Sequence, residues 1–249
     1  SLATLWMLAG IAFYLWQRAR LEAGRGGVGL LAGGTLACTL LASAAKEIGV
    51  LLTLMAGACE LTLYRSRPAR GARALDAWLV ATVVLPLAGA AVFLLMRPDW
   101  LASHYVIREY SLSERVLTES RVLWLYLGQW LAPRPAAFAL FHDDFALSTG
   151  LLRPATTALA LAALACLAVT ALALRSRLPW LAFAVAWFLA AHALESTFIA
   201  LELIHEHRNY PALVGPTVVL AALAWRGGGQ PRAVRATRLL LCGWIALAA

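Results

Sequence analysis

Charged residues are scarce in this sequence. They make up 14% of its 249 residues, against about 25% in an average soluble domain, and Lys46 is the only lysine. The shortage of charge goes with 62% hydrophobic residues and a mean hydropathy of +0.75. These values exclude a water-soluble fold, and we expect the lipid bilayer to be the solvent around much of the chain.

The sequence also lacks the cysteine patterns of a zinc site or a disulfide framework. Its four cysteines lie inside apolar runs, with no CxxC or Cys/His spacing, and we expect them to be small packing residues. The chain begins at Ser1, directly before an apolar run, and ends at Ala249 inside another. We therefore expect it to be a fragment of a longer protein.

Long apolar runs are abundant. About 20 apolar residues cross the hydrocarbon core of a bilayer, and eight runs approach or meet that length. The sequence thus predicts an all-α, polytopic transmembrane helix bundle, with residues 1–249 forming one transmembrane domain. The eight predicted spans are Leu2–Trp16, Val28–Ala45, Ile48–Tyr64, Ala77–Met96, Thr156–Leu174, Pro179 to about Ile204, Ala212–Trp225, and the run from Leu239 onward.

The formal net charge of +8 comes from arginines in short segments between the apolar runs. That placement indicates membrane topology rather than binding to nucleic acid. Thirteen arginines fall in loops that alternate to one side, accompanied there only by Glu22 and Asp76. Because cytoplasmic loops carry an excess of arginine, we expect this side to be cytoplasmic. The thirteen are Arg18, Arg20, Arg25, Arg65, Arg67, Arg70, Arg73, Arg175, Arg177, Arg226, Arg232, Arg235 and Arg238.

The region 97–155 then lies on the extracytoplasmic side, and we expect it to form a loop region with short amphipathic helices. Within it, Val122 to Ala132 is apolar but too short to cross a bilayer comfortably. We predict a short re-entrant or interfacial helix near 119–132. Pro133 and Pro135 would end it, since proline cannot continue a helix.

An acidic pattern follows the sixth apolar run. If the helix continued to Tyr210, at 3.6 residues per turn, four side chains would share an arc of about 80°. A carboxylate at the bilayer centre costs roughly 2.5 to 3.5 kcal/mol on insertion scales, so this stripe must meet basic partners or line a hydrated cavity. Salt bridging between helices and a polar cleft for an anionic or hydroxylated substrate both remain open. The stripe consists of His192, Glu195, Glu202 and Glu206, and its candidate partners are Arg115, Arg121 and Arg208.

Metal binding is a weaker hypothesis. Glu202 and His205 have half of a di-iron helix motif, but a second Glu-x-x-His pair is missing. A divalent cation held by Glu206, His207 and the outside loop stays open, because clustering of carboxylate and imidazole is a weak signal. We predict no metal site.

Two further groups are candidates for a substrate site. His142, Asp143 and Asp144 lie between phenylalanines, where adjacent carboxylates could position a sugar hydroxyl or act as a general base; an aspartate-rich turn is the alternative. Lys46 and Glu47 separate two apolar runs with almost no loop, which predicts a tight hairpin with a charged tip or one broken helix. The ammonium could hold a lipid phosphate or only snorkel to the interface.

Four glycines on the runs around this point would allow neighbouring helices to approach closely. They are Gly33, Gly34, Gly49 and Gly57.

Three segments, in this order, carry a resemblance to a known family. They are 45–52 around Lys46-Glu47, 114–127 around Arg115 and Arg121, and 207–215, which begins His207-Arg208-Asn209-Tyr210. Together they resemble the membrane portion of GT-C glycosyltransferases that carry C-terminal tetratricopeptide repeats, the group of transmembrane-and-TPR O-mannosyltransferases and their bacterial relatives. The resemblance covers approximately residues 46–215.

The resemblance implies transfer of a sugar from a polyprenyl-phosphate donor to a protein or glycan acceptor, on the periplasmic side of a bacterial inner membrane. It implies that Lys46, Arg115, Arg121 and Arg208 surround the lipid phosphate, with His207 and Tyr210 at the rim. Such enzymes usually hold their catalytic acid in the first extracytoplasmic loop. The resemblance thus puts the probable base upstream of Ser1 and the repeats downstream of Ala249, and predicts an inactive fragment.

Two other classes of function stay open. A transporter or flippase would show internal symmetry and broken helices in corresponding halves. A surface-polysaccharide polymerase or ligase would also use polyprenyl-linked donors and would also suit a large outside loop.

Overall fold

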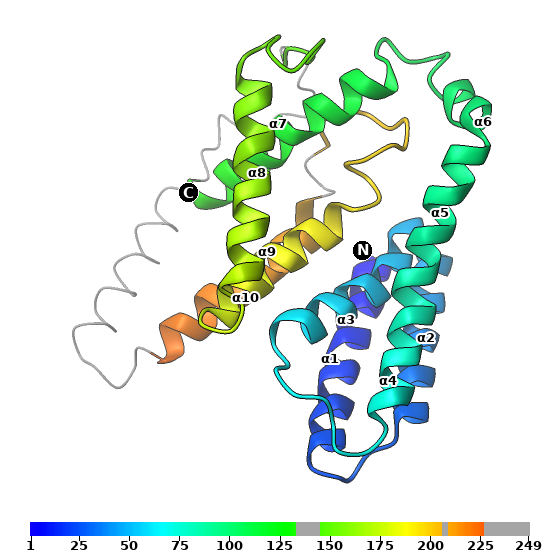
Figure 1. The fold of residues 1–249 in the computed structure, drawn as a ribbon, viewed down its shortest axis with the longest axis vertical. Coiled ribbons are helices and arrows are strands. Elements are labelled where there is room, and N and C mark those ends of the chain that lie inside the picture. The colour runs from blue at the N-terminus through cyan, green and yellow to red at the C-terminus, as the bar shows by residue number, and fades with distance from the viewer. Residues whose placement is uncertain (133–144, 206–208, 227–249) are drawn as a thin grey trace. The chain divides into compact units, whose positions relative to one another are not determined.

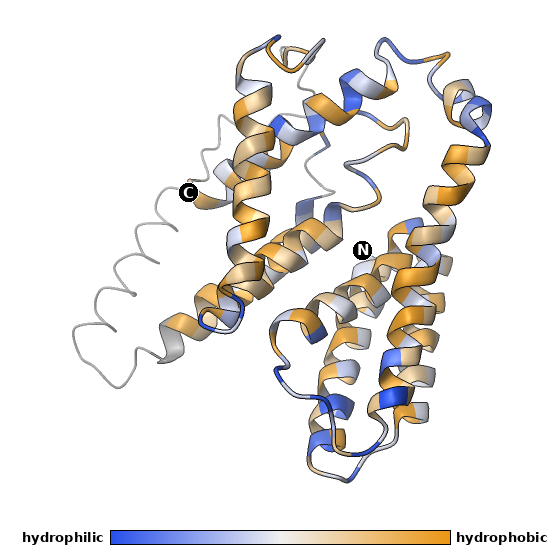
Figure 2. Ribbon diagram, in the orientation of Figure 1, coloured by the Kyte–Doolittle hydropathy of each residue, from blue (hydrophilic) through white to orange (hydrophobic). Residues whose placement is uncertain are grey.

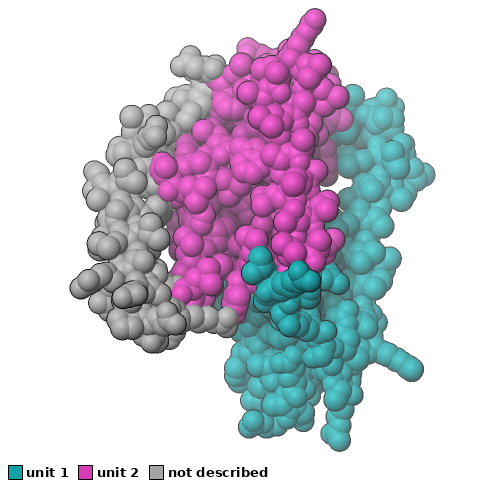
Figure 3. Space-filling model, turned by 60° about the vertical axis from the view of Figure 1, so that its left-hand side comes forward, with its two compact units in different colours: residues 1–103, 175–179 teal, residues 104–174, 180–249 magenta. Residues whose placement is uncertain are grey.

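The computed structural model describes residues 1–132, 145–205 and 209–226 (Figure 1). This part of the chain is helical, and its only β-type pairing is one bridge between Gly150 and Arg153. The prediction of an all-α protein is confirmed. Where one domain was expected, the chain divides into two compact units, coloured separately in Figure 3. Unit 1 comprises Ser1–Ser103 with Arg175–Pro179, and unit 2 comprises His104–Leu174 with Trp180–Ala249.

Unit 1 is built on a pair of closely packed helices, α1 (Leu2–Glu22) and α2 (Val28–Ala45). Gly34 lies where they meet: a Cβ atom added there would be 2.2 Å from the Phe13 ring. The predicted close approach at this glycine is confirmed, since any side chain would force the ring to move.

The chain then turns back sharply at Lys46. α2 is followed by the 3-10 helix η1 (Glu47–Val50) and by α3 (Leu51–Thr62). A Cβ added to Gly49 would lie 2.2 Å from the backbone nitrogen of Ser43, so η1 folds directly onto the end of α2. The predicted tight hairpin is confirmed, and a single broken helix is excluded.

A 25-residue helix from Ala72 to Met96 follows, and it is irregular near Pro86. Proline has no N–H, so it cannot bond the carbonyl of Thr82 four residues earlier. The Thr53 hydroxyl of α3 donates to that carbonyl instead, at 3.1 Å, which ties the long helix to α3. A π-helical turn at such an irregularity is typical. The parts are α4 (Ala72–Leu79), the π-helical η2 (Val80–Val84) and α5 (Leu85–Met96), followed by the short α6 (Pro98–Ser103).

Unit 2 contains α7 (Leu112–Leu131), α8 (Thr156–Ala173), α9 (Pro179–His192) and α10 (Asn209–Arg226). α7 packs against α8, and a small core of alanine, valine and leucine side chains joins α8 to α9. α10 meets α9 at Gly215, where an added Cβ would lie 2.4 Å from the ring of Trp187. The Trp187 indole N–H also donates to the Pro211 carbonyl, at 2.9 Å.

Among residues 1–132, 145–205 and 209–226, three helices are long and apolar enough to cross a membrane: α2, the helix Ala72–Met96, and α8. Figure 2 colours the ribbon by hydropathy, and hydrophobic residues predominate along α5 and α8. α9 and the stretch Asn209–Leu223 are apolar but shorter. Three of the eight predicted spans therefore have the required length and composition. The eight-span arrangement stays a prediction, and the run from Leu239 lies outside the described residues.

Two predicted helix boundaries are wrong. The helix expected near 119–132 begins at Leu112, because Ser111 and Glu114 form a capping box that starts it a full two turns earlier. It ends at Leu131, close to the predicted stop. The run expected to extend from Pro179 to about Ile204 is helical only as far as His192. Beyond that residue, its backbone carbonyls bond side chains of α7 and of the residues before it, as described below.

Candidate functional site

The segment 193–205 is not helical. The predicted stripe of His192, Glu195 and Glu202 on one helix face is therefore wrong, and Glu206 lies outside the described residues. Backbone carbonyls in a non-helical segment still need hydrogen-bond donors when they are removed from water. The donors come from α7 and the residues just before it.

Arg115 of α7 supplies most of them. Its side chain is fully buried, and its Nη2 donates to the Glu195 carbonyl at 2.6 Å while Nε donates to the Thr197 carbonyl at 3.2 Å. Its Nη1 donates to the carbonyls of Leu201 and Glu202. One planar guanidinium thus replaces the donors that a continuing helix would have provided.

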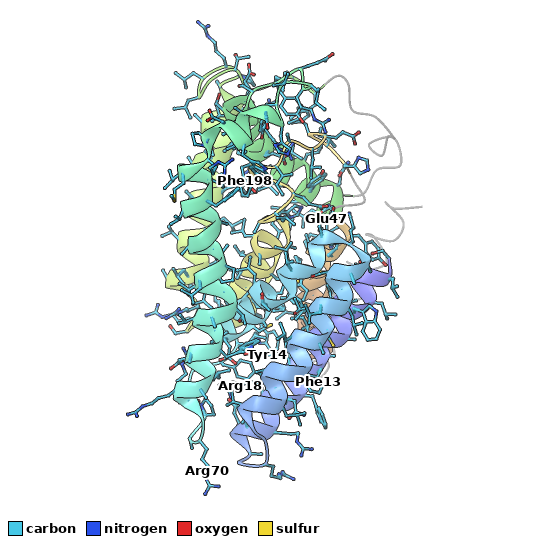
Figure 4. All side chains as sticks on the ribbon, turned by 90° about the vertical axis from the view of Figure 1, so that its right-hand side faces the viewer. Phe13, Tyr14, Arg18, Glu47, Arg70 and Phe198 are labelled. Atoms are coloured by element: carbon cyan, nitrogen blue, oxygen red, sulfur yellow. The ribbon has the colours of Figure 1, made fainter. Side chains whose placement is uncertain are left out.

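Two tyrosines before α7 act in the same way. The Tyr105 hydroxyl donates to the carbonyl of Phe198 at 2.8 Å, and the Tyr110 hydroxyl donates to that of Leu201; Phe198 is labelled in Figure 4. Loss of hydration raises the pKa of Tyr105, so this phenol stays protonated and able to donate.

Arg115 is also paired with a carboxylate. Its Nη2 lies 2.9 Å from Glu119 Oε1, one helical turn further along α7, and both side chains are buried. Because an unpaired buried charge is costly, each residue requires the other. The expected pairing of Arg115 with the carboxylates of the acidic stripe stays a prediction: Arg115 donates to the backbone carbonyls of Glu195 and Glu202, and it forms an ion pair with Glu119 on its own helix.

His192, the last residue of α9, is buried beside this segment. Its ring stacks on Tyr126 of α7 at 5.6 Å between centroids and contacts Phe188 at 4.5 Å. Its Nδ1 lies 2.9 Å from the Phe188 carbonyl. A carbonyl can only accept, so Nδ1 carries the hydrogen and Nε2 of the neutral ring is an acceptor. This Nε2 is buried and has no hydrogen-bond partner among the described residues.

Arg121, on the same helix two turns after Glu114, is partly exposed. Its Nη1 donates to the Ala146 carbonyl at 2.6 Å and to Ser148 Oγ at 3.3 Å, and its guanidinium lies 4.6 Å from the centre of the Phe145 ring. Loss of hydration lowers the pKa of Arg121, although an arginine stays charged at neutral pH. The structure therefore holds a cation at one fixed position beside residues 145–148.

The other predicted site residues are distributed as follows. Glu202 is exposed and pairs with His205 Nδ1 at 2.7 Å, whereas Glu195 is buried. Tyr210 is 68% exposed on α10. Lys46, half-buried, and Glu47, exposed, belong to unit 1. His142, Asp143, Asp144, Glu206, His207 and Arg208 lie outside the described residues.

No metal-binding group of three or more His, Cys, Asp or Glu side chains occurs in residues 1–132, 145–205 and 209–226.

Unit 1 holds a second buried charged group that the sequence reasoning missed. Glu60 of α3 accepts hydrogen bonds from the Tyr14 hydroxyl and from Arg18 Nε, each at 2.7 Å, and its other oxygen lies 3.4 Å from Arg67 Nη1. Figure 4 shows Tyr14 and Arg18 side by side. Glu60 is the only acid in the apolar run 48–64, and that isolation was the available signal, since an ionised group in such a run requires partners.

Comparison with known proteins adds no relative: no protein-family model, no curated protein and no solved structure matches the chain.

Proposed function

We propose that the chain belongs to a membrane-bound glycosyltransferase of the GT-C type, which transfers a sugar from a polyprenyl-phosphate donor to a protein on the extracytoplasmic side. The observation that carries the proposal is the cluster of Arg115, Glu119 and His192 around the segment 193–205. Burying ionisable groups away from water is costly, and a buried cluster of them is a candidate functional site. The resemblance of three segments to this family supports the same reading.

Arg115, Arg121 and His192 have different roles in this proposal. Arg115 is a positioning residue, because its donors are directed at four backbone carbonyls and one carboxylate. Arg121, held beside residues 145–148, is the cation of unit 2 that we assign to the donor phosphate, since a guanidinium matches phosphate oxygens in a bidentate manner.

His192 is assigned to the acceptor. The fixed hydrogen on Nδ1 leaves Nε2 as an acceptor, and an acceptor hydroxyl is the group that would satisfy it. In the reaction, the acceptor oxygen bonds the sugar's anomeric carbon while the bond from that carbon to the phosphate oxygen breaks. The hydroxyl proton passes to a base, and polyprenyl phosphate leaves with its charge stabilised by cations. His192 orients the hydroxyl for this displacement.

The proposed sidedness follows from the arginines. Those of the turns after α1 and α3 gather at one end of unit 1, and cytoplasmic loops carry such an excess. We therefore assign that end to the cytoplasm, and the region 97–155 to the periplasm of a bacterial inner membrane.

The test uses the full-length protein in proteoliposomes, supplied with radiolabelled polyprenyl-phosphate mannose or glucose and a protein extract as acceptor. We expect label to enter protein, and His192→Phe to lower kcat by about a hundredfold, the cost of a reacting group that is no longer held in position. Phenylalanine keeps the ring contacts with Tyr126 and Phe188 but removes both nitrogens. His104→Phe makes the same change at an exposed position and should leave transfer unchanged.

Two outcomes would overturn the proposal. If the wild-type protein moves the labelled lipid across the bilayer without transferring sugar, the chain is part of a flippase. If His192→Phe, with an unchanged melting temperature, transfers sugar at the wild-type rate, the cluster is not the acceptor site.

A further inference from the structure

One end of unit 1 is crowded with arginines from two turns that are distant in sequence. Arg20 lies in the last turn of α1 and Arg25 follows that helix, while Arg65, Arg70 and Arg73 surround the start of α4; all five are exposed. The two turns are adjacent, because a Cβ added to Gly71 would lie 2.7 Å from Val28 at the start of α2. We call these five residues the arginine end; Figure 4 labels Arg70 there and Glu47 beyond the other end of α2.

Buried side chains hold the two turns together. Arg18 is fully buried, and besides bonding Glu60 it donates from Nη2 to the Ser66 carbonyl at 2.9 Å. Arg67 bridges Glu60 at 3.4 Å and Asp76 at 2.8 Å. The turn 63–71 is therefore fixed to α1, α3 and α4 by one connected ion-pair network, and the arginine end has a defined shape.

The carboxylates of this region are already engaged. Glu22 pairs with Arg18, Glu60 with Arg18 and Arg67, and Asp76 with Arg67. None of the five arginines of the arginine end forms an ion pair in the described part of the chain; Arg65 bonds a backbone carbonyl, that of Ser176. The surface consequently keeps a concentrated positive charge, which attracts anions.

Two apolar helices begin beside the arginine end. α2 begins at Val28 and the helix Ala72–Met96 begins one residue after Gly71, and both can cross a membrane. The start of a spanning helix lies at the depth of the lipid headgroups. Trp16, 54% exposed with its ring 5.0 Å from the Arg20 guanidinium, has the amphipathic character favoured at that depth.

We propose that the arginine end binds the phosphate groups of anionic phospholipids, with phosphatidylglycerol-type headgroups as its ligands. Guanidinium forks match phosphate oxygens, and the adjoining apolar helices favour a phosphate that is attached to acyl chains over a soluble one. The proposal rests on the membrane insertion proposed above and does not depend on sugar transfer.

The test uses the full chain purified in an uncharged detergent. Binding of phosphatidylglycerol with a fluorescent acyl chain is followed by fluorescence anisotropy at low salt, with unlabelled phosphatidylglycerol, phosphatidylcholine or inorganic phosphate as competitor. We expect phosphatidylglycerol alone to compete at micromolar concentration. Arg70→Gln with Arg73→Gln should weaken binding about 25-fold, since one basic residue near an anionic surface contributes about fivefold.

The matched control removes the same charge elsewhere. Arg97 and Arg153 are exposed, and Arg97 follows the other end of the helix Ala72–Met96; Arg97→Gln with Arg153→Gln should change affinity less than twofold. Three results would each overturn the proposal: equal competition by phosphatidylcholine, competition by inorganic phosphate as effective as that by the lipid, or an equal loss of affinity in the control pair. Because no sugar donor is present, these results are independent of the glycosyltransferase assay.

Discussion

Replacing Arg115 tests the structural basis of the candidate site most severely. Arg115→Met keeps a long apolar side chain in the same space but removes every hydrogen-bond donor. The carbonyls of Glu195, Thr197, Leu201 and Glu202 lose their partner, and Glu119 keeps a buried charge without its cation.

The expected loss of stability can be worked out from these contacts. Breaking a buried ion pair by removing one partner costs about 3 to 5 kcal/mol, and each carbonyl that stays buried without a donor adds about 1 to 3 kcal/mol. Without Arg115 the segment 193–205 can open toward water, and its carbonyls then regain their hydration, so we take the ion-pair contribution alone, about 3 to 5 kcal/mol, as the expected loss. This is a large part of the roughly 5 to 15 kcal/mol that stabilises a typical native protein.

The measurement is thermal unfolding in detergent, followed by tryptophan fluorescence. For a chain of this size, about 2 to 4 °C per kcal/mol corresponds to a melting temperature lowered by about 6 to 20 °C. The double variant Arg115→Met with Glu119→Leu removes the stranded charge as well, so it should recover about 1 to 3 kcal/mol of the loss. Arg153→Gln, an exposed control, should leave the melting temperature unchanged. If Arg115→Met unfolds within about 0.5 kcal/mol of the wild type, the value usual for surface changes, the guanidinium does not hold the segment.

Two further predictions concern the hairpin in unit 1 and the start of α7. Gly49→Ala would bring a methyl group 2.2 Å from the backbone nitrogen of Ser43 and should destabilise the chain by about 1 to 3 kcal/mol. The methyl group of Gly33→Ala would meet no atom within 4 Å, so this variant should be more stable than the wild type by up to about 1 kcal/mol. Equal denaturation midpoints for the two variants would contradict the observed packing. The Glu114 carboxylate accepts hydrogen bonds from the backbone N–H and the hydroxyl of Ser111, and these bonds lower the pKa of Glu114. The ionised carboxylate therefore stabilises the fold above the ordinary glutamate pKa, and this contribution is lost as the pH falls through the lower pKa of the folded state. The glutamine of Glu114→Gln does not titrate, so the stability advantage of the wild type over this variant should shrink between about pH 6 and pH 3. If the difference in unfolding free energy between the two proteins is the same at both pH values, the ionised Glu114 carboxylate does not stabilise the start of α7.

Several features of the fold could be predicted from the sequence because they depend on local composition. Apolar runs of sufficient length identified α2, the helix ending at Met96, and α8. The hairpin at Lys46 was predictable because two such runs meet with almost no loop between them. The glycine contacts at Gly34 and Gly49 followed from the same reasoning, whereas the contact expected at Gly33 was wrong, because a Cβ added there would meet nothing within 4 Å.

The candidate site was harder to predict, since it depends on contacts between distant residues. His192 ends α9 although the sequence continues with residues that favour a helix, because Arg115, 82 residues before Thr197, offers its donors to the backbone. Helical periodicity contains no information about such a donor. Glu60, in contrast, was visible as an isolated acid in an apolar run, and the rule that intramembrane charges need partners would have identified it.

The sidedness of the two charged regions can be measured directly. In a background where Cys38, Cys59, Cys166 and Cys242 are replaced by alanine, Arg70→Cys marks the arginine end and Glu109→Cys marks the exposed turn between the two tyrosines that hold the segment 193–205. The full-length variants are exposed to a membrane-impermeant maleimide in intact spheroplasts and after lysis. We predict that Glu109→Cys is labelled in intact spheroplasts and Arg70→Cys only after lysis. Labelling of both from the same side would contradict a glycosyltransferase site that faces away from the arginine-rich turns.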